Sequence, residues 1–149
     1  MNDLSYTAKV FKTVWVSDVH LGTKGSRAKE FLEFLKTIEC EKIFLVGDIV
    51  DGWQLSKRWY WPQTHNDVVQ KILEKAKRGT EIIFIPGNHD EVARDFIGLT
   101  MGGIKVKDDD IHFTADGKNS GLFTAIYSIM LSSTQDGLPI LATGRMYFS

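Results

Sequence analysis

Three short apolar stretches constrain most strongly how this chain can fold. They cover residues 13–17, 42–46 and 81–86, are rich in β-branched and aromatic residues, and show little polar alternation. That pattern predicts strands covered on both faces, as in a parallel sheet. Two stretches of helical periodicity separate them, so right-handed crossovers are expected. Residues 104–106 and 111–114 are predicted to form further short strands, giving an α/β fold.

Each helical stretch has expected boundaries and an expected inward face. Ser26 is the predicted N-cap of the first helix, and Thr64 or Asn66 of the second, with Gly79 just beyond its end. The residues expected to point inward are Ala28, Phe31, Leu32, Leu35 and Ile38 in the first helix, and Val68, Val69, Ile72, Leu73 and Ala76 in the second.

Composition limits the class of protein. The chain has 149 residues, enough for one domain, with 43% hydrophobic and 25% charged residues, as in globular proteins. A formal net charge of -1 gives no bulk attraction to nucleic acid or anionic lipid. Cys40 is the only cysteine, which favours a reducing compartment. With no signal-peptide pattern and no apolar stretch of membrane-spanning length, a cytoplasmic location is predicted.

Metal-seeking residues follow each of the three predicted strands. They are Asp18 and His20 after the first strand, Asp48 and Asp51 after the second, and Asn88, His89 and Asp90 after the third. The carboxyl ends of parallel strands lie along one edge of a sheet, so these side chains are expected to converge. Carboxylates, imidazoles and an amide oxygen together suit one or two divalent cations.

The first two clusters each have a structural alternative. Asp18 and His20 are two residues apart and share a face of a regular strand, although a strand-end turn with a surface histidine explains that pair equally well. Asp48 follows a glycine that permits close approach of a ligand, and its carboxylate can bridge two metals about 3.5–4 Å apart. A simple Gly-Asp turn is the alternative there.

The third cluster offers three different chemical groups. Asn88 has a neutral carbonyl oxygen for a cation, and His89 can donate a proton or hold a phosphoryl oxygen. Asp90 can fix the tautomer of His89, as carboxylates behind metal sites do. A hydrophilic turn after a strand is the alternative, and the presence of all three clusters favours the metal site.

In this order, the clusters resemble the motifs of the calcineurin-like metallophosphoesterase superfamily. Asp-x-His, Gly-Asp-x-x-Asp and Gly-Asn-His-Asp are present at residues 18–20, 47–51 and 87–90. The segments that resemble the bacterial UDP-2,3-diacylglucosamine diphosphatase-like branch are residues 17–22, 46–53, 59–69 and 86–90, within a match over about residues 12–118.

The resemblance implies a fold and a set of roles. The fold would be a two-sheet αββα sandwich, with Asp18 and His20 binding one metal, Asp48 bridging both and Asn88 binding the second. Asp51 is expected in the shell behind these ligands. His89 and Asp90 are the expected catalytic residues.

The resemblance also implies cofactors and partners. It implies two divalent ions, Mn²⁺ first and Mg²⁺, Fe or Zn²⁺ as alternatives. The expected reaction is hydrolysis by a water that attacks phosphorus in line while the metals screen the developing charge. The substrate would be a phosphorylated small molecule or a lipid-linked nucleotide sugar cleaved at its pyrophosphate bond, with peripheral contact at the inner membrane. No nucleic-acid partner is indicated.

The chain departs from the family in its last part. The family has later histidine motifs, but the only histidine after Asp90 is His112, which matches none of them. The codons of residues 124–126, read one base earlier, permit the missing His-Gly-Asp. This suggests a frameshift near Lys118, so that residues 1–118 are the N-terminal part of a phosphoesterase domain and residues 119–149 are a non-family tail. Only the N-terminal half of the sandwich is then expected to be complete.

Loss of those histidines has physical consequences. Metal binding should be weak because no preorganised cage remains, and little activity is expected. A sheet face without its second sheet predicts self-association. An inactive remnant or an association-only domain therefore remains an alternative, as does a phosphodiesterase or phosphatase acting on nucleotides or phosphoproteins.

Other residues near the motifs are interpreted structurally. The aromatic segment at residues 57–61 is expected to be a packed loop rather than a substrate contact, and His65 a residue of a helix start. Arg27 and Arg94 are expected to be solvated rather than bound to phosphate, and residues 108–110 to form a solvated turn.

Overall fold

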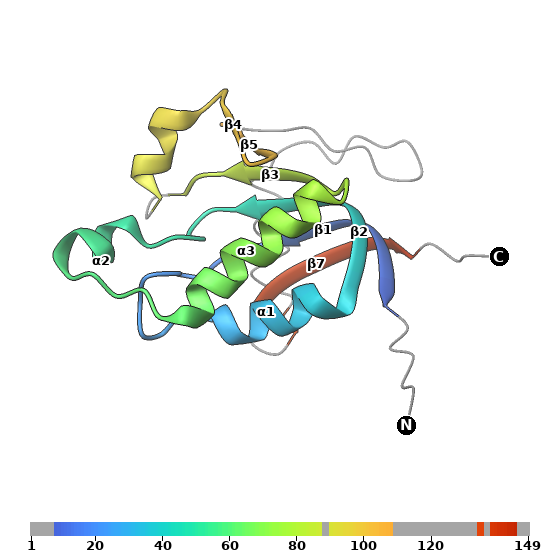
Figure 1. The fold of residues 1–149 in the computed structure, drawn as a ribbon, viewed down its shortest axis with the longest axis horizontal. Coiled ribbons are helices and arrows are strands. Elements are labelled where there is room, and N and C mark those ends of the chain that lie inside the picture. Colours follow the sequence, from blue (N-terminus) through green and yellow to red (C-terminus); the bar gives the residue numbers. More distant parts are fainter. Residues whose placement is uncertain (1–7, 88–89, 109–133, 136–137, 146–149) are drawn as a thin grey trace.

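The computed structural model describes residues 8–87, 90–108, 134–135 and 138–145. Within these ranges the strands form one seven-stranded sheet in the order β4-β5-β3-β2-β1-β7-β6 (Figure 1). The strands are β1 (Lys9–Val16), β2 (Ile38–Val46), β3 (Glu81–Ile85), β4 (Thr100–Met101), β5 (Ile104–Val106), β6 (Thr134–Gln135) and β7 (Leu138–Arg145). The helices are α1 (Ala28–Thr37), α2 (Gly52–Lys57), α3 (Gln63–Lys77) and the 3₁₀ helix η1 (Glu91–Phe96).

The centre of the sheet is parallel, as predicted. β1 pairs with β2, β2 with β3 and β3 with β5, all in parallel. The outer pairings are antiparallel, namely β4 with β5, β7 with β1 and β6 with β7. The predicted mixed α/β fold and the strand at residues 104–106 are therefore confirmed, and β1, β2 and β3 all end at the same edge of the sheet.

Helices α1 and α3 lie side by side across one face of the sheet (Figure 1). Apolar residues of both helices and of alternate strand positions form one buried cluster there, in which Phe31, Leu35 and Val68 are fully buried. Completely burying a side chain of this size contributes about 1.5–3 kcal/mol. This layer holds the loops that follow β1 and β2 against a rigid support.

The opposite face of the sheet is also apolar. Trp15 on β1 stacks on Phe44 of β2 with ring centroids 5.6 Å apart, and Ile83 on β3 continues the row. These residues are no more than 2% exposed. The self-association expected from an uncovered face gains no support from this burial and stays a prediction.

The N-terminal ends of α1 and α3 differ from the predicted ones. α1 begins after Arg27, although the Ser26 hydroxyl still accepts a hydrogen bond from the Ala28 N–H at 3.2 Å. α3 begins after Pro62 rather than at Thr64 or Asn66; Pro62 is the extended N-cap residue, and it makes no side-chain capping hydrogen bond.

The end and the inward face of α3 follow the prediction more closely. Gly79 closes the helix with φ +107°, and the N–H of Thr80 donates to the Lys75 carbonyl, as in a Schellman motif. Val68 and Ile72 are buried as expected. Leu73 is 36% exposed, so its predicted inward position was wrong.

Some expectations fall outside the described residues. These include the strand at 111–114, His112 and most of the predicted tail, while the second sheet of an αββα sandwich is not among the described strands. None of the helices in the described ranges is long and apolar enough to cross a membrane. The short helices α2 and η1 were not predicted, and both follow a candidate ligand cluster directly.

Candidate metal centre

The segments after β1 and β2 continue to pair beyond the ends of their strands. The His20 N–H donates to the Asp48 carbonyl at 2.9 Å and the Leu21 N–H to the Ile49 carbonyl at 2.8 Å, while the Asp51 N–H donates back to the Leu21 carbonyl at 2.7 Å. These hydrogen bonds join two loops that are about 30 residues apart in the sequence. They fix the distance between the first two ligand clusters.

Three candidate ligands have an unusual backbone conformation. Asp18 (φ 53°), His20 (φ 53°) and Asp48 (φ 50°) are the non-glycine residues with positive φ in the part of the chain that the structure describes. This left-handed region costs an L-residue about 1–2 kcal/mol. Such strain persists only where the surroundings enforce it, and it concentrates at functional sites.

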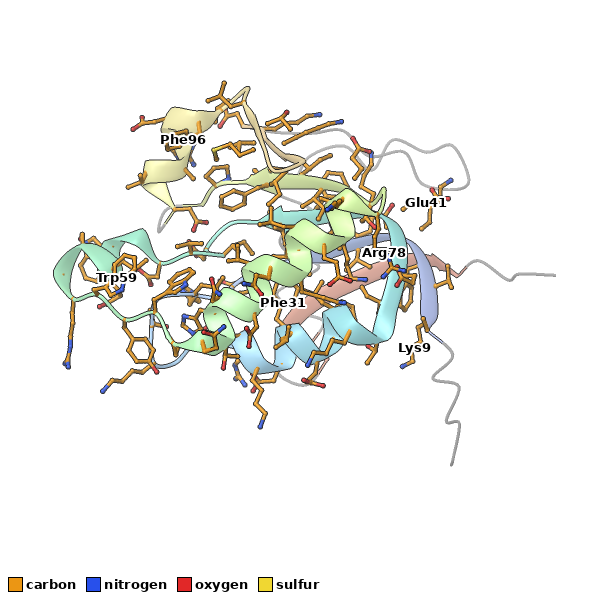
Figure 2. All side chains as sticks on the ribbon, in the orientation of Figure 1. Lys9, Phe31, Glu41, Trp59, Arg78 and Phe96 are labelled. Carbon is orange, nitrogen blue, oxygen red and sulfur yellow. The ribbon has the colours of Figure 1, made fainter. Side chains whose placement is uncertain are left out.

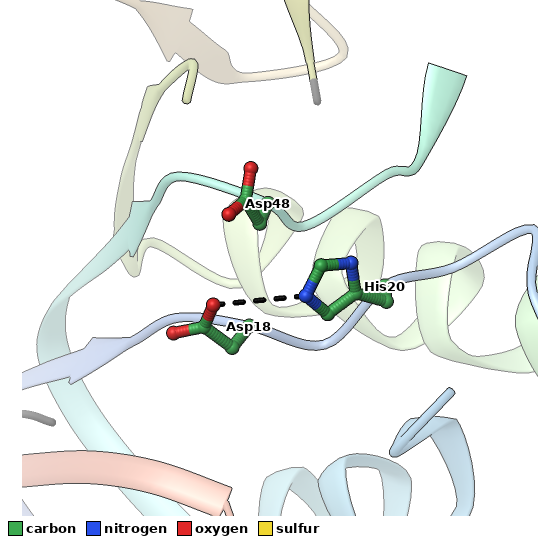
Figure 3. A group of neighbouring side chains, drawn as sticks. All are labelled: Asp18, His20 and Asp48. Atoms are coloured by element: carbon green, nitrogen blue, oxygen red, sulfur yellow. Dashed lines mark ion pairs between the residues drawn. The ribbon is translucent and has the colours of Figure 1, made fainter. Parts of the chain in front are cut away.

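The three side chains converge (Figure 3). One ligand atom from each of Asp18, His20 and Asp48 lies within 4.8 Å of the other two, and all three residues are half-buried. Nε2 of His20 is 3.6 Å from Oδ1 of Asp18. Two carboxylates and one imidazole at this separation fit a divalent cation, since they supply charge and the donor atoms that such ions prefer.

Hydrogen bonds orient two of these ligands from behind. The Ser17 hydroxyl donates to Oδ2 of Asp18 at 2.6 Å, while Oδ1 faces His20. Oδ2 of Asp51 lies 3.3 Å from Nδ1 of His20, and Oδ1 of Asp51 accepts from the Gln54 N–H at 2.9 Å at the start of α2. A buried carboxylate on one ring nitrogen fixes the histidine with its other nitrogen facing the site. Asp51 therefore lies where the sequence placed it, although its role stays a prediction.

Asp90 ties the third loop to the second. Its Oδ1 accepts from the Val50 N–H at 2.7 Å, and its Oδ2 accepts from the N–H groups of Ile49 and Gly87, both at 3.2 Å. Burial raises the pKa of this carboxyl, although the three N–H donors oppose that shift. This bracing of the backbone was not foreseen from the sequence. Asn88 and His89 lie outside the described residues, so the predicted effect of Asp90 on His89 stays a prediction.

Gly87 brings the third loop against Asp48. A Cβ atom at Gly87 would lie 2.7 Å from Cα of Gly47 and 2.8 Å from the backbone N of Asp48. No side chain fits in that space. The residue that precedes Asn88 is therefore packed directly on the residue that carries the third ligand.

Comparison with known proteins now assigns the chain to a family. The family model for calcineurin-like phosphoesterases matches residues 11–140, most of the chain. The chain belongs to the calcineurin-like phosphoesterase family. The family is named for the hydrolysis of phosphoesters, and Asp18, His20 and Asp48 are suitable metal ligands for that reaction.

Two individual proteins are similar to parts of this phosphoesterase chain. UDP-2,3-diacylglucosamine hydrolase of Azotobacter vinelandii is 30% identical over 81 residues, which cover 52% of this chain and 33% of the relative. The chain thus matches about a third of that relative's length. The crystal structure of the Pseudomonas putida nuclease MPE superposes with a TM-score of 0.39 and 24% identity over 63% of this chain and 46% of the nuclease.

The family match also runs past the predicted boundary at Lys118. It extends to residue 140, and residues 138–145 form β7 at the edge of β1. Whether residues 119–149 descend from family sequence or from a frameshift stays a prediction, which the DNA sequence near Lys118 would decide.

Around the phosphoesterase site, the aromatic segment differs from its expected packing. Trp61 is partly buried, as expected of a packed loop. Trp59 is 74% exposed and Trp53 is 54% exposed, so the packed-loop interpretation was wrong for Trp59. Figure 2 shows Trp59 and Phe96 at the end of the molecule opposite Lys9 and Arg78.

Three further residues can now be placed. Arg27 lies 3.7 Å from Glu30, and Arg94 lies 3.3 Å from Asp108, with about half of each arginine side chain exposed. Both arginines pair with a carboxylate at the surface, and the expectation that neither binds phosphate stays a prediction. His65 was assigned to a helix start and does lie in the first turn of α3, but it is also buried and accepts a hydrogen bond from the Gly22 N–H.

Proposed function

We propose that this chain is a metal-dependent hydrolase of phosphoester or pyrophosphate bonds. The observation that carries the proposal is the convergence of Asp18, His20 and Asp48 within 4.8 Å in a chain of the calcineurin-like phosphoesterase family. Two carboxylates gathered at the end of a parallel sheet would repel each other and a phosphate. A bound divalent ion removes both problems, because it neutralises the carboxylates and attracts the anionic substrate.

The residues of the chain would divide the work by position. Asp18 and His20 would hold one ion, Asp48 would reach both ions, and Asn88 would hold the second. Asp51 keeps Nδ1 of His20 engaged, so that Nε2 is available as a ligand. His89, next to Asn88, is the proposed proton donor near the leaving group. The ions, proposed as Mn²⁺ with Mg²⁺, Fe or Zn²⁺ as alternatives, supply Lewis acidity toward phosphoryl oxygens.

The substrate follows less directly from these residues. Metal ligands recognise phosphorus and say little about the group attached to it. Similarity to a UDP-2,3-diacylglucosamine hydrolase supports a lipid-linked nucleotide sugar cleaved at its pyrophosphate bond. Nucleotides and phosphoproteins are the alternative substrates.

Turnover is the first test. Purified protein with Mn²⁺ is expected to hydrolyse bis-p-nitrophenyl phosphate slowly, because the later imidazoles are missing. UDP-2,3-diacylglucosamine is the substrate that tests the proposed lipid-linked nucleotide sugar. Asp48→Asn should abolish Mn²⁺-dependent activity because it removes the shared negative ligand. Asp67→Asn on the surface of α3 is the matched control and should retain it. Activity that persists in Asp48→Asn would contradict the proposal.

A specific feature of the sequence favours a second candidate, an inactive remnant or a domain that only associates with others. After Asp90 the chain has a single histidine, His112, so it lacks the later imidazoles that the family resemblance implies. Metal analysis distinguishes the two candidates. Protein without bound Mn²⁺ and without turnover of either substrate would identify the inactive chain, and Mn²⁺ with turnover the enzyme.

A further inference from the structure

His65 is a buried histidine outside the metal centre. It lies in the first turn of α3 and is 3% exposed. Its Nδ1 accepts a hydrogen bond of 3.1 Å from the backbone N–H of Gly22, which is 43 residues away in the sequence. Gly22 follows His20 by two residues, so the hydrogen bond holds the loop that carries Asp18 and His20.

The surroundings of His65 fix both its plane and its tautomer. The planes of the Trp61 and Tyr60 rings are nearly perpendicular to its imidazole, with centroids 5.4 and 5.9 Å away. Burial lowers the pKa of the imidazole and so favours the neutral ring. A neutral ring that accepts at Nδ1 must hold its proton on Nε2.

The loop at Gly22 needs such an anchor. Gly22 has φ +100°, and a Cβ there would lie 2.6 Å from Cγ of Leu55 on α2. The chain therefore passes through a narrow space between α2 and His65. Two residues earlier, His20 holds a left-handed conformation that would relax if its neighbours were free.

We propose that His65 is a positioning residue of the metal centre. The hydrogen bond from Gly22 to Nδ1 of His65 keeps residues 18–22 in the strained conformation that aims Asp18 and His20 at Asp48. This inference rests on the proposed function in one respect: the expected consequence of holding the loop is tighter binding of metal. The hydrogen bond also explains why a buried histidine begins a helix that packs beside the site.

Paired amide substitutions test the role of Nδ1. In His65→Asn the side-chain oxygen can occupy the place of Nδ1 and accept from Gly22, whereas in His65→Gln one additional methylene moves the amide toward the place of Nε2. His65→Phe keeps the aromatic packing and removes the acceptor. Gln63→Ala, on the same turn of α3 and away from Gly22, is the control.

The first readout uses metal-free protein. Exchange of the Gly22 amide hydrogen and the imidazole NMR signals of His20 should stay near wild type in His65→Asn and Gln63→Ala. In His65→Gln and His65→Phe, exchange of the Gly22 amide should be faster and the His20 signals should shift. The proposal would be overturned if the Gly22 amide of His65→Gln and His65→Phe exchanged at the wild-type rate. Equal effects of all three His65 substitutions would also overturn it.

The second readout is the affinity for Mn²⁺, measured by calorimetric titration. Loss of a residue that orients ligands typically weakens metal binding about 10–100-fold, and that loss is expected for His65→Gln but not for His65→Asn. If His65→Phe unfolds, the Asn and Gln pair still decides, because the two differ by one methylene. A wild-type protein that binds no Mn²⁺ would overturn the proposed function, while the metal-free spectra would still decide the role of His65.

Discussion

The candidate ligands hold their positions against a conformational preference. Asp18, His20 and Asp48 each have a positive φ near 50°, a backbone conformation that residues with a Cβ rarely adopt. The Ser17 hydroxyl donates to Asp18, the Asp51 carboxylate accepts from Nδ1 of His20, and the backbone pairing of the two loops holds the ligands there. At the scale of single residues, the site is therefore a set of strained positions that nearby hydrogen bonds stabilise.

Gly87 gives a steric prediction at this scale. Gly87→Ala places a methyl group within 3 Å of the backbone of Gly47 and Asp48, so the two loops must separate. We expect a loss of about 1–3 kcal/mol in the free energy of unfolding, as in other overpacked sites, together with weaker Mn²⁺ binding. Urea unfolding and calorimetric titration measure the two effects.

Gly25→Ala is the matched control for that prediction. A Cβ at Gly25 meets no atom within 4 Å, and its φ is not in the left-handed region. Stability and Mn²⁺ affinity should stay near wild type in this variant. Equal behaviour of Gly87→Ala and Gly25→Ala would contradict the close approach of the two loops.

Cys40 gives a chemical prediction. Burial raises the pKa of its thiol to about 11, although the nearby Lys75 acts in the opposite direction. At pH 8 only about one thiol in a thousand would then be ionised in the folded protein. We expect iodoacetamide to react about a hundredfold more slowly with folded than with guanidinium-unfolded protein. The rate for the folded protein should rise with pH up to about 11, and equal rates for both forms at pH 8 would contradict this account.

At the scale of elements, α2 and the segment after it combine exposed tryptophans with basic residues. Nζ of Lys57 lies 3.3 Å from the centroid of the Trp53 ring, and Lys57 and Arg58 are both exposed beside Trp59. Residues 52–66 contain no acidic residue. The peripheral membrane contact that the family resemblance implies stays a prediction, and this arrangement suits it because tryptophan prefers the headgroup region and basic residues attract anionic lipids.

Vesicle binding tests that contact. The double variant Trp53→Ser with Trp59→Ser should co-sediment less than wild type with phosphatidylglycerol vesicles, because the side chains suited to the headgroup region are gone. Wild type should bind pure phosphatidylcholine vesicles more weakly. Leu99→Ser removes an apolar side chain of similar exposure and is the control. Membrane contact through α2 is excluded if the double variant and Leu99→Ser sediment alike.

At the scale of the whole molecule, the sheet joins residues from both ends of the chain. β7 lies against the free side of β1, with Ile140 opposite Val16 and Arg145 opposite Phe11. Without β7, β1 would be an open edge, and open edges promote aggregation. The part of the chain that was predicted to be a non-family tail thus supplies a strand.

Deletion of residues 138–149 tests the importance of that strand. The shortened chain should unfold at a lower urea concentration, since each ladder hydrogen bond lost costs about 1 kcal/mol, and it should elute as larger species in size-exclusion chromatography. If residues 119–149 are only a tail without a structural role, deletion will leave both measurements unchanged.

The sequence by itself determined β1, β2, β3, β5, the helices α1 and α3, and the edge of the sheet at which the candidate ligands gather. Hydrophobic period and β-branched content report local geometry, and in parallel strands that geometry places Asp18, His20 and Asp48 at one edge. Those signals depend on residues that are close in the sequence, so they can be recognised without any knowledge of tertiary packing. The same signals could not set the helix starts, because the N-cap residues Arg27 and Pro62 make no side-chain capping hydrogen bond, which is the signal that a sequence can reveal.

Only the tertiary structure decided how the loops are held. The backbone hydrogen bonds from Ile49 and Val50 to Asp90, the hydrogen bond from Gly22 to His65 and the pairing of β7 with β1 each join residues far apart in the chain. No periodicity encodes such contacts, because a loop adopts a strained backbone only when packed neighbours and long-range hydrogen bonds offset the cost. The sequence thus supplied the ligands, and the packing of distant segments determined the positions in which they meet.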